Sequence, residues 1–431
     1  MANVQARRKP LVGTRASNPI AALDIGCSKI TCLIGRNDGT GPRNFQILGA
    51  GRQQSRGFNG GTITDMHGLE RSIRLAVEDA EREAGEQISQ VVLGITGSKL
   101  NCQLVTAEID IGGREVTPKD IRRVQAQAMA QIPTKGADVL AAWPVAYRVD
   151  AQEGVREPAG MYADRLGLLL SVVTAPKAMV RNLVECVGRA HLGVEMLIPS
   201  SIASGAGTLI DDEIENGAIC IDMGAGVTAV SVYLNGSPAW LGLVPAGGTH
   251  VTSDIAQGIG TTFAAAERLK SVYGTANMEG PGLAERIEAP RLGDDGRLQA
   301  TRMERGQLAE IIAPRIEEIF ELVQRTLQAS GVRKVLPRRV VLTGGASQLP
   351  GVREVAMRTL EAPVRLGRPT NAEFLGETLG TPAFSTASGL LLYTELGFAD
   401  AVRAGIASKE YGAEARSGAV NKAFHWLKEN F

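Results

Sequence analysis

The sequence predicts an α/β protein built on a duplicated strand-and-helix unit, with a small module inserted into its first half. Strands and amphipathic helices alternate along most of the chain, a Gly-rich hairpin that follows an Asp occurs in each half, and a polar segment interrupts the alternation. At about 150 residues per domain, a chain of 431 residues has room for roughly two to four packing units.

Composition and charge exclude several classes of protein. The apolar and charged fractions, 44% and 21%, are those of a globular protein. Lys plus Arg and Asp plus Glu both number 46, so no overall field attracts nucleic acid, and we expect no nucleic-acid partner. The five cysteines form no Cys-x-x-Cys pair and the four histidines are scattered, which favours a reducing cytoplasm over a zinc site or a disulfide framework.

Neither the start of the sequence nor its apolar runs predict a segment that crosses a membrane. Residues 1–17 are basic and polar without the apolar stretch of a signal peptide, and we expect a loose tail. The longest apolar run, residues 166–175, is far shorter than the roughly 20 residues that a spanning helix needs. That run therefore predicts a buried strand.

The first half opens with a hairpin. Residues 20–25 are an apolar run, a Gly turn follows, and alternating apolar residues predict a second strand from about Ile30. Residues 69–84 place apolar side chains at helical spacing with charges between them, and residues 91–96 predict the next strand. This order of elements is typical of an α/β domain.

Residues 97–162 break this order and predict a small inserted α+β module. Residues 101–113 indicate a polar strand pair, and residues 139–150 indicate another strand. Between them, Thr117 and Asp120 flank Pro118 in the pattern of a capped helix start.

The second half repeats the layout of the first. An apolar strand, an Asp, a Gly-rich turn and a return strand follow one another from Gly217 onward. The other expected elements are a helix at 177–190, a linker at 198–205, a loop at 274–300, a helix at 308–330, a strand at 338–345 and a flexible linker from about 398.

The two hairpin turns carry the residues that chemistry at a phosphate needs. Backbone amides in a Gly turn can hold phosphate oxygens, and an Asp can hold Mg²⁺ through water. A single Asp-x-Gly turn is more often only a turn; two copies facing one cleft would hold a polyphosphate from both sides. The residues concerned are Asp24, Gly26, Ser28 and Lys29 in the first turn and Asp222, Gly224, Gly226 and Thr228 in the second.

Two further segments suit a nucleoside. Gly344, Gly345 and Ser347 follow an apolar strand, where small residues would let a base and ribose lie against backbone, although a simple strand-to-helix turn explains them equally. Glu267 and Lys270 lie on one helix face downstream of Gly248; they could reach a ribose or base, or form a surface ion pair.

Taken in this order, these motifs resemble the actin-like ATPase superfamily and, within it, the FtsA family of bacterial cell-division proteins. The similarity covers roughly residues 18–395 and includes the phrases ALDIGCSKITCLIG, IDMGAGVTAVSVY, PAGGTHVTSDIAQGI, AERLK and VVLTGGASQLPGV. It implies an actin-like, ribonuclease-H-like, two-lobed fold in which the inserted module is the family's subdomain IC.

The resemblance also implies a division of the chain. Subdomain IA would comprise 18–96, 163–203 and 367–397, IC 97–162, IIA 204–245 and 338–366, and IIB 246–337, followed by a linker at 398–420 and an amphipathic helix at 421–431.

The resemblance implies that the site binds ATP together with Mg²⁺. Both turns would contact phosphates, Asp24 and Asp222 would organise Mg²⁺ through water, and Glu267, Lys270, Gly344 and Gly345 would hold the nucleoside. In the linker near Pro199, relatives often carry Glu or Gln to position water, but this chain has Ile198 before the proline and Ser200 after it. We therefore expect at most weak ATPase activity.

The last eleven residues have the pattern of a short interfacial helix. Phe424, Leu427 and Phe431 share one face, with Trp426 beside them and Lys428 able to reach lipid headgroups. The alternative is a helix docked on the protein's own core. The family carries such a tail, and one tail binds weakly, so stable attachment would need several tails on one polymer.

The resemblance implies a cytoskeletal adaptor on the cytoplasmic side of the inner membrane at the division site. Its partners would be FtsZ, held through subdomain IIB, further copies of itself, membrane lipids and later divisome proteins. Two alternatives remain: a pilus-assembly-type relative, and a small-molecule kinase or chaperone ATPase of the same superfamily. A kinase would need a catalytic carboxylate and a sugar pocket, and the sequence points to neither.

Overall fold

The computed structural model of the protein describes residues 18–39, 41, 43–133, 135–279, 282–332, 336–396 and 398. The expected tail at 1–17, the expected helix at 421–431 and the linker at 398–420 beyond its first residue lie outside the described residues. In the described part of the chain, no helix combines the length and the apolar character that crossing a membrane requires.

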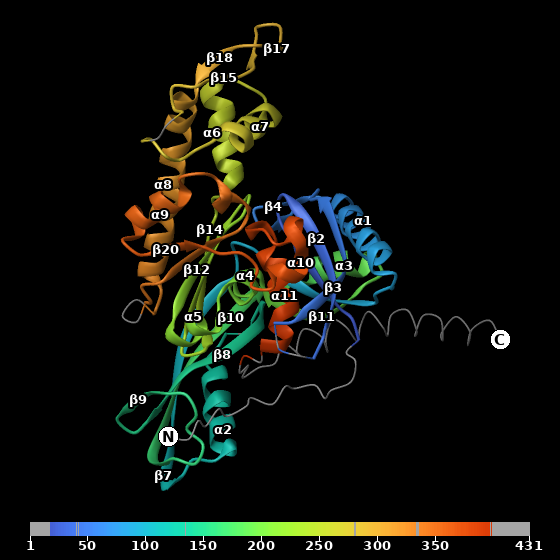
Figure 1. The fold of residues 1–431 in the computed structure, drawn as a ribbon. Helices are drawn as coiled ribbons and strands as arrows, with labels where there is room; N and C mark the ends of the chain where they lie inside the picture. Colours follow the sequence, from blue (N-terminus) through green and yellow to red (C-terminus); the bar gives the residue numbers. More distant parts are fainter. Residues whose placement is uncertain are drawn as a thin grey trace, which may run out of the picture.

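The first lobe is a five-stranded sheet covered on both faces. Its order is β11-β6-β1-β2-β3, and Figure 1 shows α1 and α11 on opposite sides of it. One face packs on α1 and α3 through side chains such as Leu69 and Leu183, and the other packs on α11 through Leu391. The elements are β1 (Ile20–Ile25), β2 (Lys29–Asn37), β3 (Phe45–Gln54), β6 (Gln90–Ile95), β11 (Gly193–Pro199), α1 (Met66–Ala84), α3 (Lys177–Arg189) and α11 (Ser385–Leu396), with a small hairpin of β4 (Phe58–Asn59) and β5 (Thr62–Ile63).

Close approach of α1 to this sheet depends on glycine. A Cβ at Gly51 would lie 1.7 Å from the Ala76 carbonyl oxygen of α1, so only glycine fits there. The helix begins at the N-cap Asp65, whose side chain accepts a hydrogen bond from the His67 amide, and it ends at Gly85 with a φ of 69°. The hairpin and the helix that the sequence predicts here are confirmed.

The second lobe repeats the first. Its sheet has the order β14-β13-β12-β19-β20, in which β12, β13 and β14 are antiparallel neighbours and β19 and β20 run parallel to β12. The first sheet has the same arrangement, with β1, β2 and β3 antiparallel and β6 and β11 parallel. The elements are β12 (Ala218–Met223), β13 (Thr228–Leu234), β14 (Ser237–Val244), β19 (Val340–Thr343), β20 (Val364–Leu366), α5 (Asp211–Asn216) and α9 (Val352–Leu360). The duplication is confirmed.

A buried helix, α4 (Ser200–Thr208), carries the chain from the first lobe to the second. We expected a linker here, and this was wrong. Its Ser, Ala and Gly residues allow it to touch α11 so closely that a Cβ on Gly389 would lie 1.7 Å from the Ala203 carbonyl oxygen. Small side chains, which in sequence indicate a loop, therefore serve tight helix packing.

The inserted module is a four-stranded sheet that projects from the lobes on one side (Figure 1). Its elements are β7 (Asn101–Glu115), α2 (Pro118–Met129), β8 (Ala137–Val149), β9 (Gln152–Val155) and β10 (Tyr162–Pro176), in the order β7-β10-β8-β9. The polar strand pair expected at 101–113 is one strand, β7, because it has a full-length partner in β10. Because of that pairing, the module's sheet continues beyond residue 162, where the sequence predicts the end of the module. The division of the chain into subdomains IA, IC, IIA and IIB stays a prediction.

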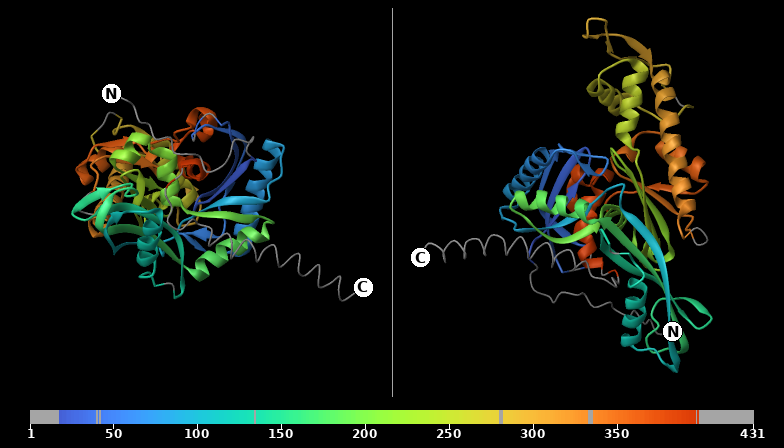
Figure 2. Two further views of the ribbon diagram at one scale, coloured as in Figure 1. Left: turned by 90° about the horizontal axis from the view of Figure 1, so that it is seen from below. Right: turned by 180° about the vertical axis from the view of Figure 1, so that it is seen from behind.

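A second projection extends from the second lobe on the side away from the module, as both side views show (Figures 1 and 2). It consists of α6 (Gly248–Ile259), α7 (Phe263–Tyr273), α8 (Arg305–Ala329) and two small ladders, β15 (Arg286–Glu288) with β18 (Arg302–Glu304) and β16 (Arg291–Leu292) with β17 (Leu298–Gln299). The loop expected at 274–300 therefore contains short strands. Two short 3-10 helices, η2 (Gly345–Gln348) and η3 (Pro382–Phe384), complete the region around the cleft, and α10 (Ala372–Leu379) packs with α11 on the first sheet.

Candidate functional site

A cleft of about 750 Å³ lies between the two lobes. Both hairpin turns, the start of α6, one face of α7 and the loop after β19 line it. Twelve of the residues singled out from the sequence are among its lining: Asp24, Gly26, Ser28, Lys29, Asp222, Gly224, Gly226, Gly248, Glu267, Lys270, Gly344 and Gly345. Segments far apart in the chain thus meet at one place, as the motif order predicts.

The two hairpin turns have the same geometry and touch each other. In the first, the Gly26 amide donates to the Lys29 carbonyl over 3.0 Å; in the second, the Gly224 amide donates to the Val227 carbonyl over 3.0 Å. A Cβ on Gly226 would lie 2.8 Å from the Cys27 sulfur of the opposite turn. The turns therefore face each other across the cleft, and the Cys27 side chain leaves no room for a side chain at position 226.

Two carboxyl groups share this space without full compensation. Burial, and after it the charge of Asp222, raises the pKa of Asp24 to about 7, although Lys29 acts in the opposite direction. Burial likewise raises the pKa of Asp222, even though the Thr386 hydroxyl donates to its Oδ2 over 2.8 Å. Such a pair favours protons or a cation beside it. The two groups therefore fit an electropositive ligand.

Lys29 brings the positive charge of the first turn. Its Nζ lies 3.4 Å from the ring centroid of Phe384, a cation–π contact. Burial lowers the pKa of Lys29 to about 8, and the charge of Asp24 opposes that change. An ammonium that is already partly stripped of water and lines the cleft is suited to bind an anion.

Glu267 and Lys270 form an ion pair and also line the cleft. Lys270 Nζ donates to Glu267 Oε2 over 2.7 Å, to Thr252 Oγ1 over 2.7 Å and to the Gly248 carbonyl over 3.0 Å. The Glu267 side chain is 47% exposed, against 16% for Lys270. Lys270 therefore fixes the start of α6 against α7, while Glu267 keeps surface for a ligand.

Gly344 needs its glycine and Gly345 leaves open space. Gly344 has a φ of 87°, and a Cβ there would lie 2.2 Å from Asp222 Oδ1. A Cβ on Gly345 would meet only the Ala383 Cβ, at 3.8 Å. This loop therefore lies flat against the second carboxylate and leaves its other side open to the cleft.

Thr228 and Ser347 are not among the residues that line the cleft, and their assignment as ligand contacts stays a prediction. The Thr228 hydroxyl is fully buried and donates to the Ala246 carbonyl over 2.8 Å. The Ser347 hydroxyl donates to the Gly344 carbonyl over 2.7 Å. Both side chains point to backbone and hold the loops that do line the cleft.

Several lining residues gave no sign in the sequence. They come from the end of β3 and the turn after it, from β4, from the start of α7 and from α11: Gln54, Ser55, Phe58, Phe263 and Thr386. Thr386 reaches Asp222 from the last helix, a proximity that no local pattern encodes. Ser200, at the start of α4, also lines the cleft; the sequence drew attention to it beside Pro199 but predicted a linker there.

A Mg²⁺ ion in the cleft would need further ligands besides the carboxylates of Asp24 and Asp222. In the described parts of the chain, no three His, Cys, Asp or Glu side chains gather as metal ligands would. Asp24 and Asp222 are hard oxygen donors of the kind that Mg²⁺ prefers, and Mg²⁺ in nucleotide sites usually keeps water and phosphate ligands. The residues fit the ion when a phosphate accompanies it.

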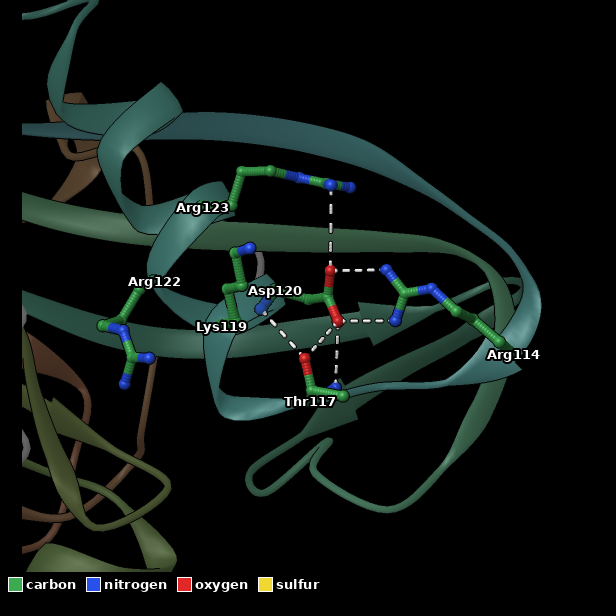
Figure 3. Close-up of a pocket in the computed structure, with 6 residues that line it drawn as sticks. All are labelled: Arg114, Thr117, Lys119, Asp120, Arg122 and Arg123. Atoms are coloured by element: carbon green, nitrogen blue, oxygen red, sulfur yellow. Dashed lines mark hydrogen bonds and ion pairs between the residues drawn. The ribbon is translucent and has the colours of Figure 1, made fainter.

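A smaller hollow at the tip of the inserted module is structural. Figure 3 shows the Asp120 carboxylate at its centre, surrounded by Arg114, Thr117 and Arg123. Asp120 accepts from both terminal nitrogens of Arg114 over 2.7 Å and from the Thr117 hydroxyl over 2.6 Å. These bonds hold the pKa of Asp120 well below its usual range. The Asp120 carboxylate is thus part of the N-terminal cap of α2, which confirms the capped helix start that the sequence predicts.

Comparison with known proteins identifies relatives of the whole chain. Residues 219–389 match the sequence model described as "Cell division protein FtsA", and residues 97–174 match "SHS2 domain inserted in FTSA", which coincides with the module and includes β10. The cell division protein FtsA of Agrobacterium fabrum is 39% identical over 99% of this chain and 97% of its own length.

Solved structures share the fold at low identity. The type IV pilus biogenesis complex PilM–PilN covers 87% of this chain and 98% of its own, with a TM-score of 0.61 and 17% identity. MreB5 of Spiroplasma citri bound to ADP covers 84% of this chain and 95% of its own, with a TM-score of 0.52 and 10% identity. The predicted actin-like fold with an inserted module is confirmed.

Proposed function

The chain belongs to the FtsA family of cell division proteins, and from this we propose that it binds ATP with Mg²⁺ in the cleft between its lobes. One observation supports the proposal above the others: two equivalent Gly turns, each following a half-buried carboxylate, face each other across that cleft. Such an arrangement suits a polyphosphate with a cation.

The parts of the nucleotide would be held by different elements. Backbone amides of the turns at Gly26 and Gly224 and the Lys29 ammonium would bind phosphate oxygens. Asp24 and Asp222 would hold Mg²⁺ through water, and the ion would supply the charge that neutralises both carboxylates and phosphates. Glu267 and the open backbone at Gly345 would face the ribose and base.

We further propose that the protein polymerises on the cytoplasmic face of the inner membrane, anchors the FtsZ ring and helps to recruit later divisome proteins. Family membership supports this role, and so does the pattern of Phe424, Trp426, Leu427, Lys428 and Phe431, which lies outside the described residues. A pilus role has only the fold in its favour, because the PilM likeness stands at 17% identity.

Nucleotide binding is tested by titration calorimetry of the full chain with ATP, with Mg²⁺ and with EDTA. We expect saturable one-site binding that Mg²⁺ strengthens. Heat of dilution alone in both buffers would refute the proposed site.

Membrane attachment is tested separately by co-sedimentation with liposomes of anionic and zwitterionic lipid. The full chain is compared with a chain ending at Ala419, each with and without ATP and Mg²⁺. We expect only the full chain to pellet, and ATP to increase the fraction, since polymerised tails act together. If both chains stay in solution while ATP is consumed, the kinase-like alternative gains ground.

A further inference from the structure

Two hydroxyls that line the cleft, those of Ser55 and Ser200, are buried without a hydrogen-bond partner within the described residues, and Ser200 is the more deeply buried residue of the two. The Ser200 hydroxyl belongs to a residue only 6% exposed, it lines the cleft, and it makes no hydrogen bond within the described residues. A buried hydroxyl without a partner is costly, and such groups in native proteins usually await a water or a ligand.

Ser200 is also the first residue of α4. The helix starts directly after Pro199, and no side chain in the described part of the chain accepts a hydrogen bond from the amides of its first turn. Amides at a helix start, together with the helix dipole, favour an anion. The unpartnered hydroxyl therefore lies where the helix itself attracts negative charge.

The hydroxyl lies close to the first carboxylate. A Cβ placed on Gly94 of β6 would be 2.9 Å from Ser200 Oγ and 3.7 Å from Asp24 Oδ1, so both oxygens gather around the same glycine. An anion beside Ser200 would therefore need the Mg²⁺ that the proposed function assigns to Asp24, because the cation offsets the repulsion from the carboxylate.

The helix has no freedom to relieve the unpartnered group by moving. On one side a Cβ on Gly207 would lie 2.3 Å from the Ser385 carbonyl oxygen of α11. On the other, the Tyr233 hydroxyl donates to the Ile202 carbonyl over 2.7 Å, and the Tyr233 ring packs against Gly205. Packing on both sides holds Ser200 in place before any ligand arrives, which lowers the cost of binding.

We propose that Ser200 and the uncapped start of α4 bind the terminal phosphate of a nucleoside triphosphate, so that the cleft distinguishes a triphosphate from a diphosphate. This inference rests on the proposed nucleotide site and adds to it the group that recognises the end of the polyphosphate. A diphosphate bound at the two turns lacks the phosphate that would reach Ser200 and leaves the hydroxyl unpartnered.

The test measures two affinities on the full chain. Ser200→Ala is compared with the unmodified protein by calorimetry with Mg²⁺, using ADP and an ATP analogue whose terminal bridge is an imido group. Loss of one hydrogen bond to a charged group predicts an about tenfold weaker affinity for the triphosphate. Affinity for ADP is expected to stay unchanged.

Ser201→Ala is the matched control. Ser201 is the next residue of the same helix, is 3% exposed and also lacks a hydrogen-bond partner within the described residues, but it does not line the cleft. We expect its variant to bind both nucleotides as the unmodified protein does. Both variants should keep or slightly raise the melting temperature without nucleotide, since each removes a buried unpaired hydroxyl.

The possible outcomes separate this inference from the function on which it rests. If the unmodified protein binds nucleotide but Ser200→Ala weakens both nucleotides equally, or neither, the assignment of Ser200 is wrong and the site stands. If the unmodified protein binds neither nucleotide, the proposed function and this inference fail together.

Discussion

The two lobes share one frame and differ in what they add to it. Both sheets consist of three antiparallel strands followed by two parallel ones, and both hairpin turns close with the same hydrogen bond. The first turn, however, carries Cys27, Ser28 and Lys29, whereas the three corresponding residues of the second turn, 225–227, are small or apolar. The frame places two carboxylates opposite each other, and the first turn alone adds a positive charge.

The insertions differ in the same way. The first lobe carries its module between β6 and β11, and the second carries its projection between β14 and β19. In each case the equivalent connection of the other lobe contains mainly one helix. The lesson is that the two insertions are not equivalent: the projection of the second lobe adds α6 and α7 to the wall of the cleft, whereas the module of the first lobe adds none of its described residues to it. Changes at the site and in the module should therefore be separable.

Loss of either carboxylate should produce the largest effect. Asp24→Ala and Asp222→Ala are each expected to weaken Mg²⁺-dependent ATP binding about a hundredfold, since each removes a charged contact from a buried site. Calorimetry with and without Mg²⁺ measures this loss of ATP affinity. Equivalent losses would show that the lobes contribute equally; a loss confined to one variant would contradict a shared ion.

The next effect concerns stability without metal. Because the folded pKa of Asp24 is about 7, above its ordinary value of 3.8, the folded state holds this proton more firmly than the unfolded one. The free energy of unfolding should therefore fall as pH rises from about 4 to about 7. Asp24→Asn should flatten that slope and raise stability at pH 8 by on the order of 2 kcal/mol.

Urea denaturation in EDTA across this pH range tests the point. Asp222→Asn should also flatten the slope, because its charge is the second cause of the raised pKa of Asp24. An unchanged slope in the Asp222 variant would show that the two carboxyl groups do not sense each other, and an unchanged slope in the Asp24 variant would show that the pKa of Asp24 is not raised.

Removal of the positive charge from the first turn should have a smaller effect on binding. Lys29→Ala is expected to weaken ATP binding about tenfold, as loss of one charged hydrogen bond does. Arg52→Ala is the control, since Arg52 influences the pKa of Lys29 by its charge but does not line the cleft. Equal losses of ATP affinity in the Lys29 and Arg52 variants would indicate that Lys29 acts through its long-range electrostatic field and not through contact with the nucleotide.

The smallest effect is expected in the insertions. Thr117→Ala removes the cap of α2 and should lower local stability by about 1 kcal/mol. Thr262→Ala removes the cap of α7, where Thr262 accepts from the Ala265 amide, and should cost less because Thr117 also donates to Asp120. Hydrogen exchange should rise in each helix separately, and ATP affinity should be retained in the Thr117 variant, because α2 lies outside the cleft lining. Loss of ATP affinity in the Thr117 variant would contradict separable surfaces.

Local patterns predicted much of the fold and of the site. The paired strand hairpins, the α1 periodicity and the Thr117 cap were found from the sequence, because each depends on neighbours in the chain. The twelve cleft residues lie in short motifs, and the resemblance of these motifs to a known family predicted that they form one site. The sequence did not indicate α4 as a helix, since its small residues form one only by packing on α11. Nor did it separate Thr228 and Ser347 from the residues that line the cleft, because a hydroxyl in a Gly-rich motif looks the same whether it turns to backbone or to the cleft.

The position of α11 determines when the first lobe can fold. Leu390, Leu391 and Leu392 cover the face of the first sheet that contains Ala22, Leu33 and Val92. A ribosome makes those strands long before it makes this helix, so the apolar face of the first sheet stays uncovered while the second lobe emerges. Contacts between such distant parts of a chain slow folding and expose surface that aggregates. The first lobe therefore completes its core last, although its strands are made first.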